Sequence, residues 1–474
     1  MEMSKRICEM RPQMIDALKE LIKCKSVQGE AQPGAPFGKE AARCLDTALE
    51  ISEKLGFRTH NMDGYVGWAE YGEGDEMVAV LCHLDVVPEG DGWTVCEPYD
   101  PVVKDGNLYG RGAIDNKGPC VASLFGMKAL MDEGFVPERR IRLIFGCNEE
   151  TGSGDIHYYR THGGEIPVAG FTPDANYPLV NGEKGYMNLG FEQKLVQHGP
   201  WKLVSIEGGA ASNIVPQYCK AVLEVDSEVK AEDIVVIMET ALAEESSFDE
   251  NISWKLESTV EGSVLTIEAK GIAAHASLPQ FGENAIGRMC LFLKKLPLNC
   301  EAANFLADKI GMEHTGESLN VALWDEPSGA LTLNMGIISS YKEGEDVVIR
   351  VLLDSRCPVT FEREDLIPVL KNAFEGAGWS TYQEGWANPL YQSLESENVQ
   401  KLLKAYRDIT GDDSPAMCIG GGTYAKSMPN IMAFGPCRKG IDNREHGADE
   451  FIILDDMMQD AEIYARAMQA LATK

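Results

Sequence analysis

The segment Met77–Pro88, MVAVLCHLDVVP, carries a histidine and an aspartate within an otherwise apolar run. Such a run is typical of a buried β-strand, and burying either polar side chain without a partner costs free energy. Residues two apart on a strand point to the same face, so His83 and Asp85 should serve one common site. The spacing therefore predicts a shared partner for these two side chains near the end of the strand.

Further acidic residues follow the apolar strands expected in the same part of the chain. They are Asp115, Glu149, Glu150 and Asp174. In open α/β sheets, ligand sites form beyond the carboxyl ends of the strands, so residues far apart in sequence converge there. Carboxylates that converge without a cation repel one another, and their pKa values rise. A divalent cation would remove this repulsion, and the pattern therefore predicts a metal site.

Each of these residues also has a purely structural interpretation when it is taken alone. A single histidine in a strand is more often a core or surface residue than a metal ligand. Asp115 could cap a helix, and Asp174 could form a turn beside Pro173. The Glu149–Glu150 pair could simply be solvated. Because such positions at successive strand ends are hard to explain as independent accidents, we favour one common site.

The mixture of ligand types indicates which metal and how many ions. Imidazole and carboxylate together suit zinc, and less selectively manganese or cobalt. A catalytic zinc usually takes three protein ligands, and one histidine with three or four acidic residues exceeds that number. The set suits two ions that share a bridging carboxylate, provided that one more ligand comes from elsewhere. His446, in the C-terminal segment DNREHGADE, is the candidate.

The composition restricts the partners. The chain has 474 residues and a formal net charge of −31, which argues against nucleic acid or an anionic membrane as a partner. Thirteen cysteines without a C-x-x-C pair favour a reducing cytoplasm over a disulfide scaffold. The N-terminal segment has no long apolar run, and no apolar stretch reaches about 18 residues, so we expect no signal peptide and no membrane span.

The order of the expected elements divides the chain into two domains. Strands alternate with helices through residues 1–182, beginning with a helix over 10–24. This order predicts an α/β catalytic domain with a mostly parallel sheet and helices on both faces. From 183 to 385 the strands alternate apolar and polar residues, which predicts an inserted α+β lid domain with an antiparallel sheet. The first pattern returns over 386–474, so the catalytic domain is expected to be discontinuous in sequence.

Five segments carry a recognisable pattern. They are CHLDVVPEGDGW (82–93), DGNLYGRGAIDNKGP (105–119), NEETGSGD (148–155), TPDANYP (172–178) and REHGADE (444–450). They resemble the dinuclear-zinc family that holds dipeptidases, aminoacylases, glutamate carboxypeptidases and succinyl-diaminopimelate desuccinylases, and above all its PepV-type bacterial dipeptidases. The resemblance covers most of the chain. It implies a metal-dependent dipeptidase that hydrolyses the peptide bond of dipeptides with a free amino terminus.

The resemblance also implies roles for the residues already singled out. Two metal ions, zinc in preference to manganese or cobalt, would be held by His83 and Asp174 on one ion, Glu150 and His446 on the other, and Asp115 bridging both. Asp85 would orient His83. Glu149 would act as general base on the attacking water.

The peptide bond after the bridging aspartate is typically cis in this family, and here that bond is Asp115–Asn116. Asn116 stands where an aspartate is common. Because the side chain at that position is not a usual ligand, we expect little effect on the metals.

Three segments of the insertion match the same family. They are ASNIVP (211–216), GIAAHASLP (271–279) and LLDSRCP (352–358). By resemblance, His275 would polarise the scissile carbonyl, and Asn213 would add a hydrogen bond to the substrate. Arg356 would bind the substrate's terminal carboxylate with its planar guanidinium. Taken alone, His275 would be interpreted as a surface histidine and Arg356 as an ion-pair residue.

The glycine-rich segment GGGTYAK (420–426) matches as well. The family implies that Gly421, Gly422 and Thr423 line the substrate pocket, although three glycines alone could form only a turn. Lys426 stands where arginine is frequent, and a lysine is a point charge rather than a planar fork.

Two alternatives remain open. An aminoacylase or a related hydrolase of N-acyl amino acids would use identical metal chemistry with a different pocket. A catalytically inactive metal-binding protein belongs to another functional class, and the retention of Glu149 and every proposed ligand argues against it. Because PepV-type enzymes supply the lid histidine within one chain, we expect a monomer.

Overall fold

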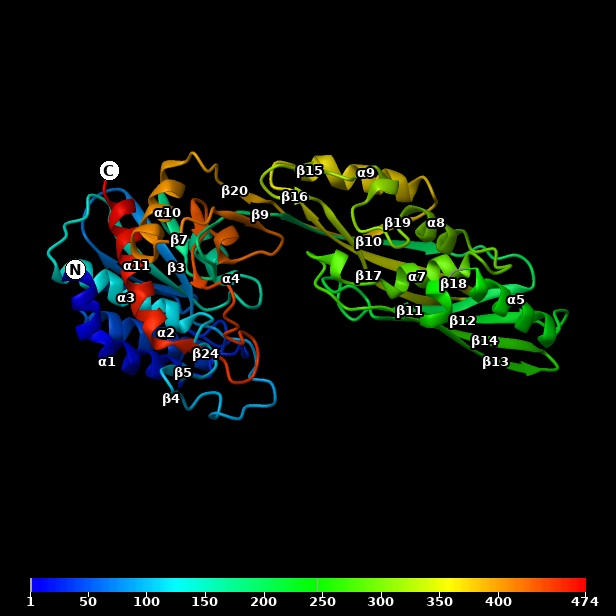
Figure 1. Cartoon of the computed structure of the whole chain (residues 1–474), viewed down its shortest axis with the longest axis horizontal. Helices are drawn as coiled ribbons and strands as arrows, with labels where there is room; N and C mark the ends of the chain where they lie inside the picture. The colour runs from blue at the N-terminus through cyan, green and yellow to red at the C-terminus, as the bar shows by residue number, and fades with distance from the viewer. Residues whose placement is uncertain (1, 245) are drawn as a thin grey trace. The chain divides into compact units, whose positions relative to one another are not determined.

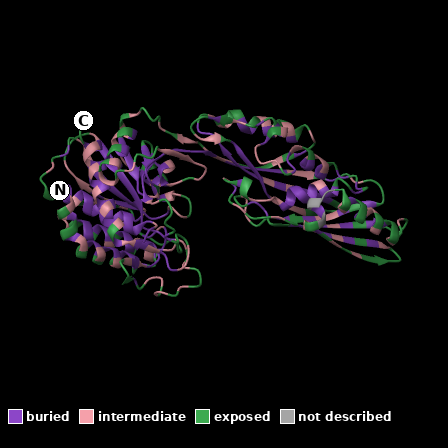
Figure 2. Ribbon diagram, viewed as in Figure 1, coloured by how far each residue is buried: buried purple, intermediate pink, exposed green. Residues whose placement is uncertain are grey.

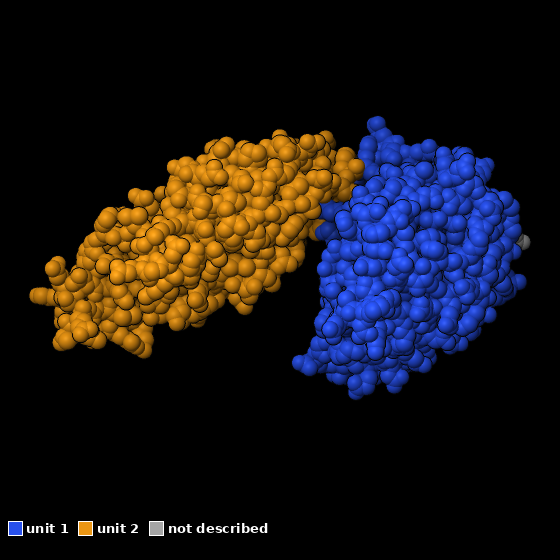
Figure 3. Space-filling view, turned by 180° about the vertical axis from the view of Figure 1, so that it is seen from behind, with its two compact units in different colours: residues 1–182, 392–418, 422–474 blue, residues 183–391, 419–421 orange. Residues whose placement is uncertain are grey.

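The computed structural model describes residues 2–244 and 246–474 (Figure 1). The chain forms two compact units, coloured separately in Figure 3. The first unit comprises Met1–Gly182, Gln392–Cys418 and Gly422–Lys474, and the second comprises Glu183–Tyr391 and Ile419–Gly421. In each unit the buried residues follow the strands and the inner faces of the helices (Figure 2).

The first unit is built on a nine-stranded mixed sheet. Its order is β1 (Arg58–Met62), β2 (Val66–Tyr71), β6 (Arg140–Gly146), β3 (Met77–His83), β7 (Ala169–Thr172), β22 (Ile431–Ala433), β9 (Val180–Glu183) and β20 (Leu390–Tyr391), with β21 (Met417–Ile419) paired to β9. The residues of β20 fall within the range of the second unit. The central strands β6, β3, β7 and β22 run parallel, and antiparallel pairs flank them. The predicted mostly parallel sheet is confirmed for this central part.

Helices cover the sheet of the first unit. They are α1 (Glu2–Ile22), α2 (Lys39–Lys54), α3 (Lys117–Asp132), α4 (Gly154–Thr161), α10 (Glu397–Thr410) and α11 (Leu454–Ala472). The helix α3 packs against α1 and α11, while α2 packs against β1 and β2. Every residue of β3 is buried, which is expected of a strand covered on both faces.

Several short elements connect distant parts of the first unit. A small antiparallel sheet joins β4 (Val102–Lys104), β5 (Asn107–Tyr109) and β24 (Phe451–Ile453). A parallel pair joins β8 (Ala175–Asn176) to β23 (Pro436–Cys437). A short 3-10 helix, η3 (Tyr424–Ser427), packs against β22, β3 and β7. These contacts bring the C-terminal loops to the edge of the sheet where the central strands end.

The second unit is an α+β structure. Its eight-stranded antiparallel sheet has the order β13 (Ile252–Thr259), β14 (Gly262–Lys270), β12 (Tyr218–Asp226), β11 (Trp201–Gly208), β17 (Thr332–Glu343), β18 (Asp346–Cys357), β10 (Gly185–Lys194) and β19 (Ser380–Ala387). Its helices are α5 (Ala231–Ala243), α6 (Ser246–Asn251), α7 (Ala285–Leu293), α8 (Glu301–Lys309) and α9 (Arg363–Glu375), with short elements η1 (Pro279–Phe281), η2 (Glu317–Leu319), β15 (Trp324–Asp325) and β16 (Gly329–Ala330). The predicted α+β insertion with an antiparallel sheet is confirmed.

Among the described residues, no helix is both long enough and apolar enough to cross a membrane.

Candidate metal centre

The candidate ligands lie where the central strands of the first unit end. His83 is the last residue of β3, and Asp174 follows β7 by two residues. Glu149 and Glu150 follow β6, Asp115 precedes α3, and His446 lies in the loop between β23 and β24. Because β6, β3 and β7 are parallel neighbours, their carboxyl ends share one edge of the sheet. The structure therefore brings together side chains that are spread over most of the sequence.

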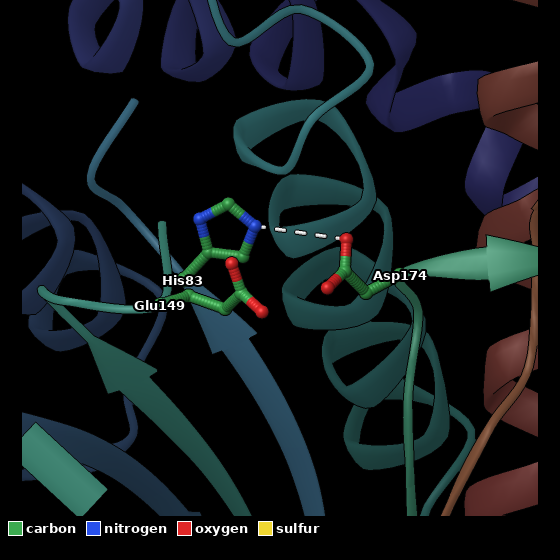
Figure 4. A group of neighbouring side chains, drawn as sticks. All are labelled: His83, Glu149 and Asp174. Atoms are coloured by element: carbon green, nitrogen blue, oxygen red, sulfur yellow. Dashed lines mark ion pairs between the residues drawn. The ribbon is translucent and has the colours of Figure 1, made fainter. Parts of the chain in front are cut away.

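Asp115 lies at the middle of this cluster. Its Oδ1 is 3.0 Å from His83 Nε2, and its Oδ2 is 2.9 Å from His446 Nε2. His83 Nε2 is also 3.6 Å from Asp174 Oδ1, the pair joined by the dashed line in Figure 4. His446 Nε2 is 3.3 Å from Glu150 Oε2. The two oxygens of Asp115 thus face two different imidazoles, as the bridging role requires.

Two overlapping groups of side chains have the compactness of a metal site. His83, Glu149 and Asp174 form one, drawn in Figure 4, and His83, Asp115 and Glu150 form the other. Within each group the ligand atoms lie within 4.8 Å of one another. Glu149, to which the sequence assigned proton transfer, is close enough to His83 and Asp174 to be a ligand as well.

Without a metal ion, four side chains of the cluster have raised pKa values. Contacts with the carboxylates of Asp115 and Glu150 raise the pKa of His446 to about 11. Burial lowers the pKa of His83, but its neighbours Asp115 and Asp174 outweigh burial and raise that pKa well above the ordinary value. Burial raises the pKa of Asp174 to about 6 and that of Glu149 to about 8. A cation would take over the neutralising role of these protons.

The residues present fit a pair of divalent cations. Among the described residues, the buried Glu150 Oε1 has no hydrogen-bond partner, and the contacts of the buried His83 Nε2 with Asp115 and Asp174 lack hydrogen-bond geometry, which is uncommon for buried polar atoms. A bound metal ion would satisfy such a donor atom without a hydrogen bond. Two imidazoles with carboxylates form a donor set that suits zinc, and the carboxylate between the imidazoles suits two ions better than one.

Asp85 has a wider role than the sequence indicated. Its carboxylate accepts hydrogen bonds from the backbone amides of Glu149 and Glu150, each at 3.1 Å. The same carboxylate is 3.6 Å from His83 Nδ1, while the backbone oxygen of Asp85 lies nearer that nitrogen, at 3.1 Å. Asp85 therefore contacts the loop that carries both glutamates in addition to His83.

The bond Asp115–Asn116 is cis, as expected from the resemblance. The side chain of Asn116 is buried, and its Nδ2 donates to Pro173 O at 2.5 Å and to Asp174 Oδ1 at 3.3 Å. Asn116 therefore contacts a candidate ligand directly, which the motif alone did not indicate.

The residues predicted to bind substrate from the insertion lie near one another in the second unit. Ile214 and His275 form an isolated β-bridge, and Ala276 N donates to Asn213 O at 2.8 Å. Burial and then the positive charge of Arg356 lower the pKa of His275. Gly421 belongs to this unit, whereas Gly422 and Thr423 belong to the first.

Arg356 is held in a fixed orientation. Its Nε and Nη2 donate to the two oxygens of Asp354 at 3.0 and 3.3 Å, and its Nη1 donates to Gly420 O at 3.1 Å. The guanidinium also stacks over the ring of Tyr186, 4.7 Å from the ring centroid. The sequence suggested the arginine, but the partners that orient it could not be inferred.

The proton content of the metal-free centre predicts how its stability depends on pH. Asp174, Glu149 and His446 all have folded pKa values above their ordinary values. The stability that they contribute is complete below their ordinary values and is lost as the pH rises through about 6, 8 and 11. The pKa of Asp115 is shifted in the opposite direction, because contacts with His446 and His83 overcome burial and lower it. The stability that Asp115 contributes is therefore lost only in acid. We therefore expect a lower urea midpoint at pH 9 than at pH 5 for the chelated protein.

Urea unfolding of the chelated protein at a series of pH values checks this expectation. The fall in the urea midpoint from pH 5 to pH 9 should be smaller in His446→Asn, which lacks one of the three groups with a raised pKa. A midpoint that is constant or rises from pH 5 to pH 9 would show that these protons are not bound as described.

Comparison with known proteins identifies the family of the chain. The profile of Peptidase family M20/M25/M40 matches residues 79–470. "Putative dipeptidase YtjP" of Bacillus subtilis (strain 168) is 35% identical over 483 residues, covering 98% of each chain. "Putative dipeptidase SH1171" of Staphylococcus haemolyticus (strain JCSC1435) is 32% identical over 480 residues, covering 99% of each chain.

Solved structures share the fold at lower identity. Human carnosine dipeptidase 1 has a TM-score of 0.54 with 17% identity, and the di-peptidase Dug1p from Saccharomyces cerevisiae has 0.57 with 15%. Each comparison covers 99% of this chain and 98% of the other. The resemblance identified from the five segments is thereby confirmed at the level of the family. The chain belongs to Peptidase family M20/M25/M40, and it is a metallopeptidase.

Proposed function

We propose that the chain is a dipeptidase that hydrolyses dipeptides with a free amino terminus, using two divalent metal ions, preferably zinc. The observation that carries this proposal is the placement of Asp115 between the imidazoles of His83 and His446. The names of relatives that align over nearly the whole chain support the choice of dipeptides as substrates.

Two ions held by His83, Asp174, Asp115, Glu150 and His446 would polarise the scissile carbonyl and would lower the pKa of a water molecule toward about 7. Glu149 takes a proton from this water as its oxygen bonds to the carbonyl carbon. Glu149 then returns the proton to the departing nitrogen as the C–N bond breaks, so it ends the cycle as it began. Burial raises the pKa of Glu149 to about 8 in the metal-free chain, and the positive charge of bound cations would lower that pKa, so that the carboxylate can accept a proton.

Residues outside the metal centre are proposed to recognise the substrate. Arg356 uses three of its five N–H groups to contact Asp354 and Gly420, and we assign the remaining two to the substrate's terminal carboxylate. His275 would stabilise negative charge on the carbonyl oxygen, and Asn213 would add a hydrogen bond. Gly421, Gly422 and Thr423 are proposed to line the pocket. We also propose that the enzyme acts as a monomer.

The experiment compares a panel of free dipeptides with the corresponding N-acetyl amino acids. The protein is first chelated and then reconstituted with zinc, manganese or cobalt in turn. We expect no hydrolysis without metal, and turnover of dipeptides well above that of N-acetyl amino acids after reconstitution. Efficient hydrolysis of N-acetyl amino acids with little action on dipeptides would instead indicate an aminoacylase. Equal activity before and after chelation would overturn the metal-dependent mechanism.

A further inference from the structure

Arg111 and Glu450 form a buried ion pair beside the candidate metal centre. Arg111 Nη1 is 2.8 Å from Glu450 Oε2, and each side chain is only 1% exposed. Both residues lie in segments that resemble the family, yet the mechanism above gives neither of them a role. A buried ion pair is weak grounds for stability, because the cost of removing two charges from water can exceed their attraction. The position of this pair therefore calls for a different explanation.

Glu450 binds the backbone that leads to the bridging carboxylate. Its Oε2 accepts from the amide of Gly112 at 2.9 Å in addition to Arg111. Its Oε1 accepts from the amides of Ile114 at 2.9 Å and Asp115 at 3.2 Å. One carboxylate thus receives three backbone amides of a single loop, the last of which belongs to Asp115 itself. These contacts fix where the Asp115 side chain leaves the backbone.

Arg111 extends the same contacts to the loop that carries His446. Its Nη2 donates to His446 O at 3.2 Å and to Glu89 O at 3.1 Å. The backbone of His446 has a φ of 60°, a left-handed conformation that side-chain-bearing residues rarely adopt without support. The guanidinium is planar and can contact Glu450 and His446 at once, whereas a lysine would offer one point charge.

We propose that Arg111 and Glu450 are positioning residues that hold Asp115 and His446 at the separation needed to share a metal ion. The inference rests on the proposed function, because it assumes that these two side chains are ligands. It predicts that weakening the pair lowers metal affinity, most strongly for the ion shared by Asp115, Glu150 and His446. The ion bound by His83 and Asp174 is affected less, because only Asp115 connects it to the pair.

Two variants test the two halves of the pair. Glu450→Gln keeps the shape but places an amide N–H₂ group or a neutral oxygen against backbone N–H donors. Arg111→Lys keeps the charge but loses the planar fork. Arg142 and Glu70 provide a matched control, because they form a largely buried ion pair at 2.6 Å in the same unit, between β6 and β2. The control variants are Glu70→Gln and Arg142→Lys.

The measurement is competition for Zn²⁺ between each protein and a chelator, with the bound zinc counted per chain. We expect Glu450→Gln and Arg111→Lys to bind the weaker of two zinc ions about 10 to 100 times less tightly, the range typical of residues that orient ligands. Both ions should still bind at saturating zinc. Urea unfolding of the metal-free proteins provides the second readout, in which the two variants should lose no more stability than the control variants.

The outcomes separate the inference from the function on which it rests. Unchanged zinc affinity in either variant would overturn the positioning role while leaving the two-metal enzyme intact. An equal loss of affinity in Glu70→Gln and Arg142→Lys would also overturn it, because affinity would then follow general stability. If Glu450→Gln does not fold, Arg111→Lys alone decides. If the unaltered protein binds no zinc, the proposed function fails, and the inference fails with it.

Discussion

Replacing Glu149 with glutamine is expected to lower kcat for dipeptide hydrolysis by about 10²- to 10⁴-fold, the contribution typical of a general acid–base. Glutamine has nearly the same size as glutamate but cannot accept a proton at neutral pH. The two metal ions should remain bound, because the proposed ligands are unchanged. Steady-state kinetics on a dipeptide, together with metal content per chain, measure both quantities.

The neighbouring residue provides the matched control for this prediction. Glu150→Gln removes a proposed ligand, so it should lower metal content as well as activity. The side chain of Glu149 lies close to His83 and Asp174, which also allows it to be a ligand. If Glu149→Gln loses metal as readily as Glu150→Gln, Glu149 is a ligand and another group must move the proton.

Asp115→Ala is expected to have the largest effect on metal binding. Its two oxygens face His83 and His446, so removing this one carboxylate deprives both ions of a ligand. We expect loss of both ions at zinc concentrations that saturate the unaltered protein, and a fall in activity of at least about 10³-fold. Elemental analysis after dialysis, followed by a dipeptide assay, measures the effect.

Asp46→Ala serves as the control for Asp115→Ala, because Asp46 is an exposed acidic residue on α2. It should retain full metal content and activity. Retention of two ions by Asp115→Ala would show that this carboxylate does not bridge them, even if activity were reduced.

The four site residues that follow β3, β6 and β7 could be predicted to converge because these strands are parallel neighbours. Apolar runs in the sequence predicted the buried strands β3, β6 and β7. Because these strands are parallel, the polar residues at their ends lie at one edge of the sheet. His446 was predicted because the donor set lacked one ligand and because the segment REHGADE (444–450) resembles the family. The structure then places it against Asp115 and Glu150.

The supporting contacts could not be predicted, because their partners are backbone groups. Asp85 receives the amides of Glu149 and Glu150, and Glu450 receives the amide of Asp115. Every residue except proline has such an amide, so the sequence carries no signal for these contacts. Asn116 is similar, since its role depends on the nearby carbonyl of Pro173.

The fold followed the hydrophobic pattern wherever elements are long. In β18, Val347, Ile349, Val351 and Leu353 all lie in the core of the second unit, as their alternation indicates. The first helix was expected from residue 10 and instead begins at Glu2, because Met3, Ile7 and Met10 continue its buried face. The strands β5 and β24 have three residues each, too few to show a period, yet they join the Asp115 loop to the His446 loop.

The central claim is that Asp115 lies between two metal ions held by His83 and Asp174 on one side and Glu150 and His446 on the other. Anomalous X-ray scattering from zinc-soaked crystals, recorded on both sides of the zinc absorption edge, tests it directly. Two anomalous peaks should flank the Asp115 carboxylate, one beside His83 and one beside His446. A single peak, or peaks away from Asp115, would contradict the two-metal centre described here.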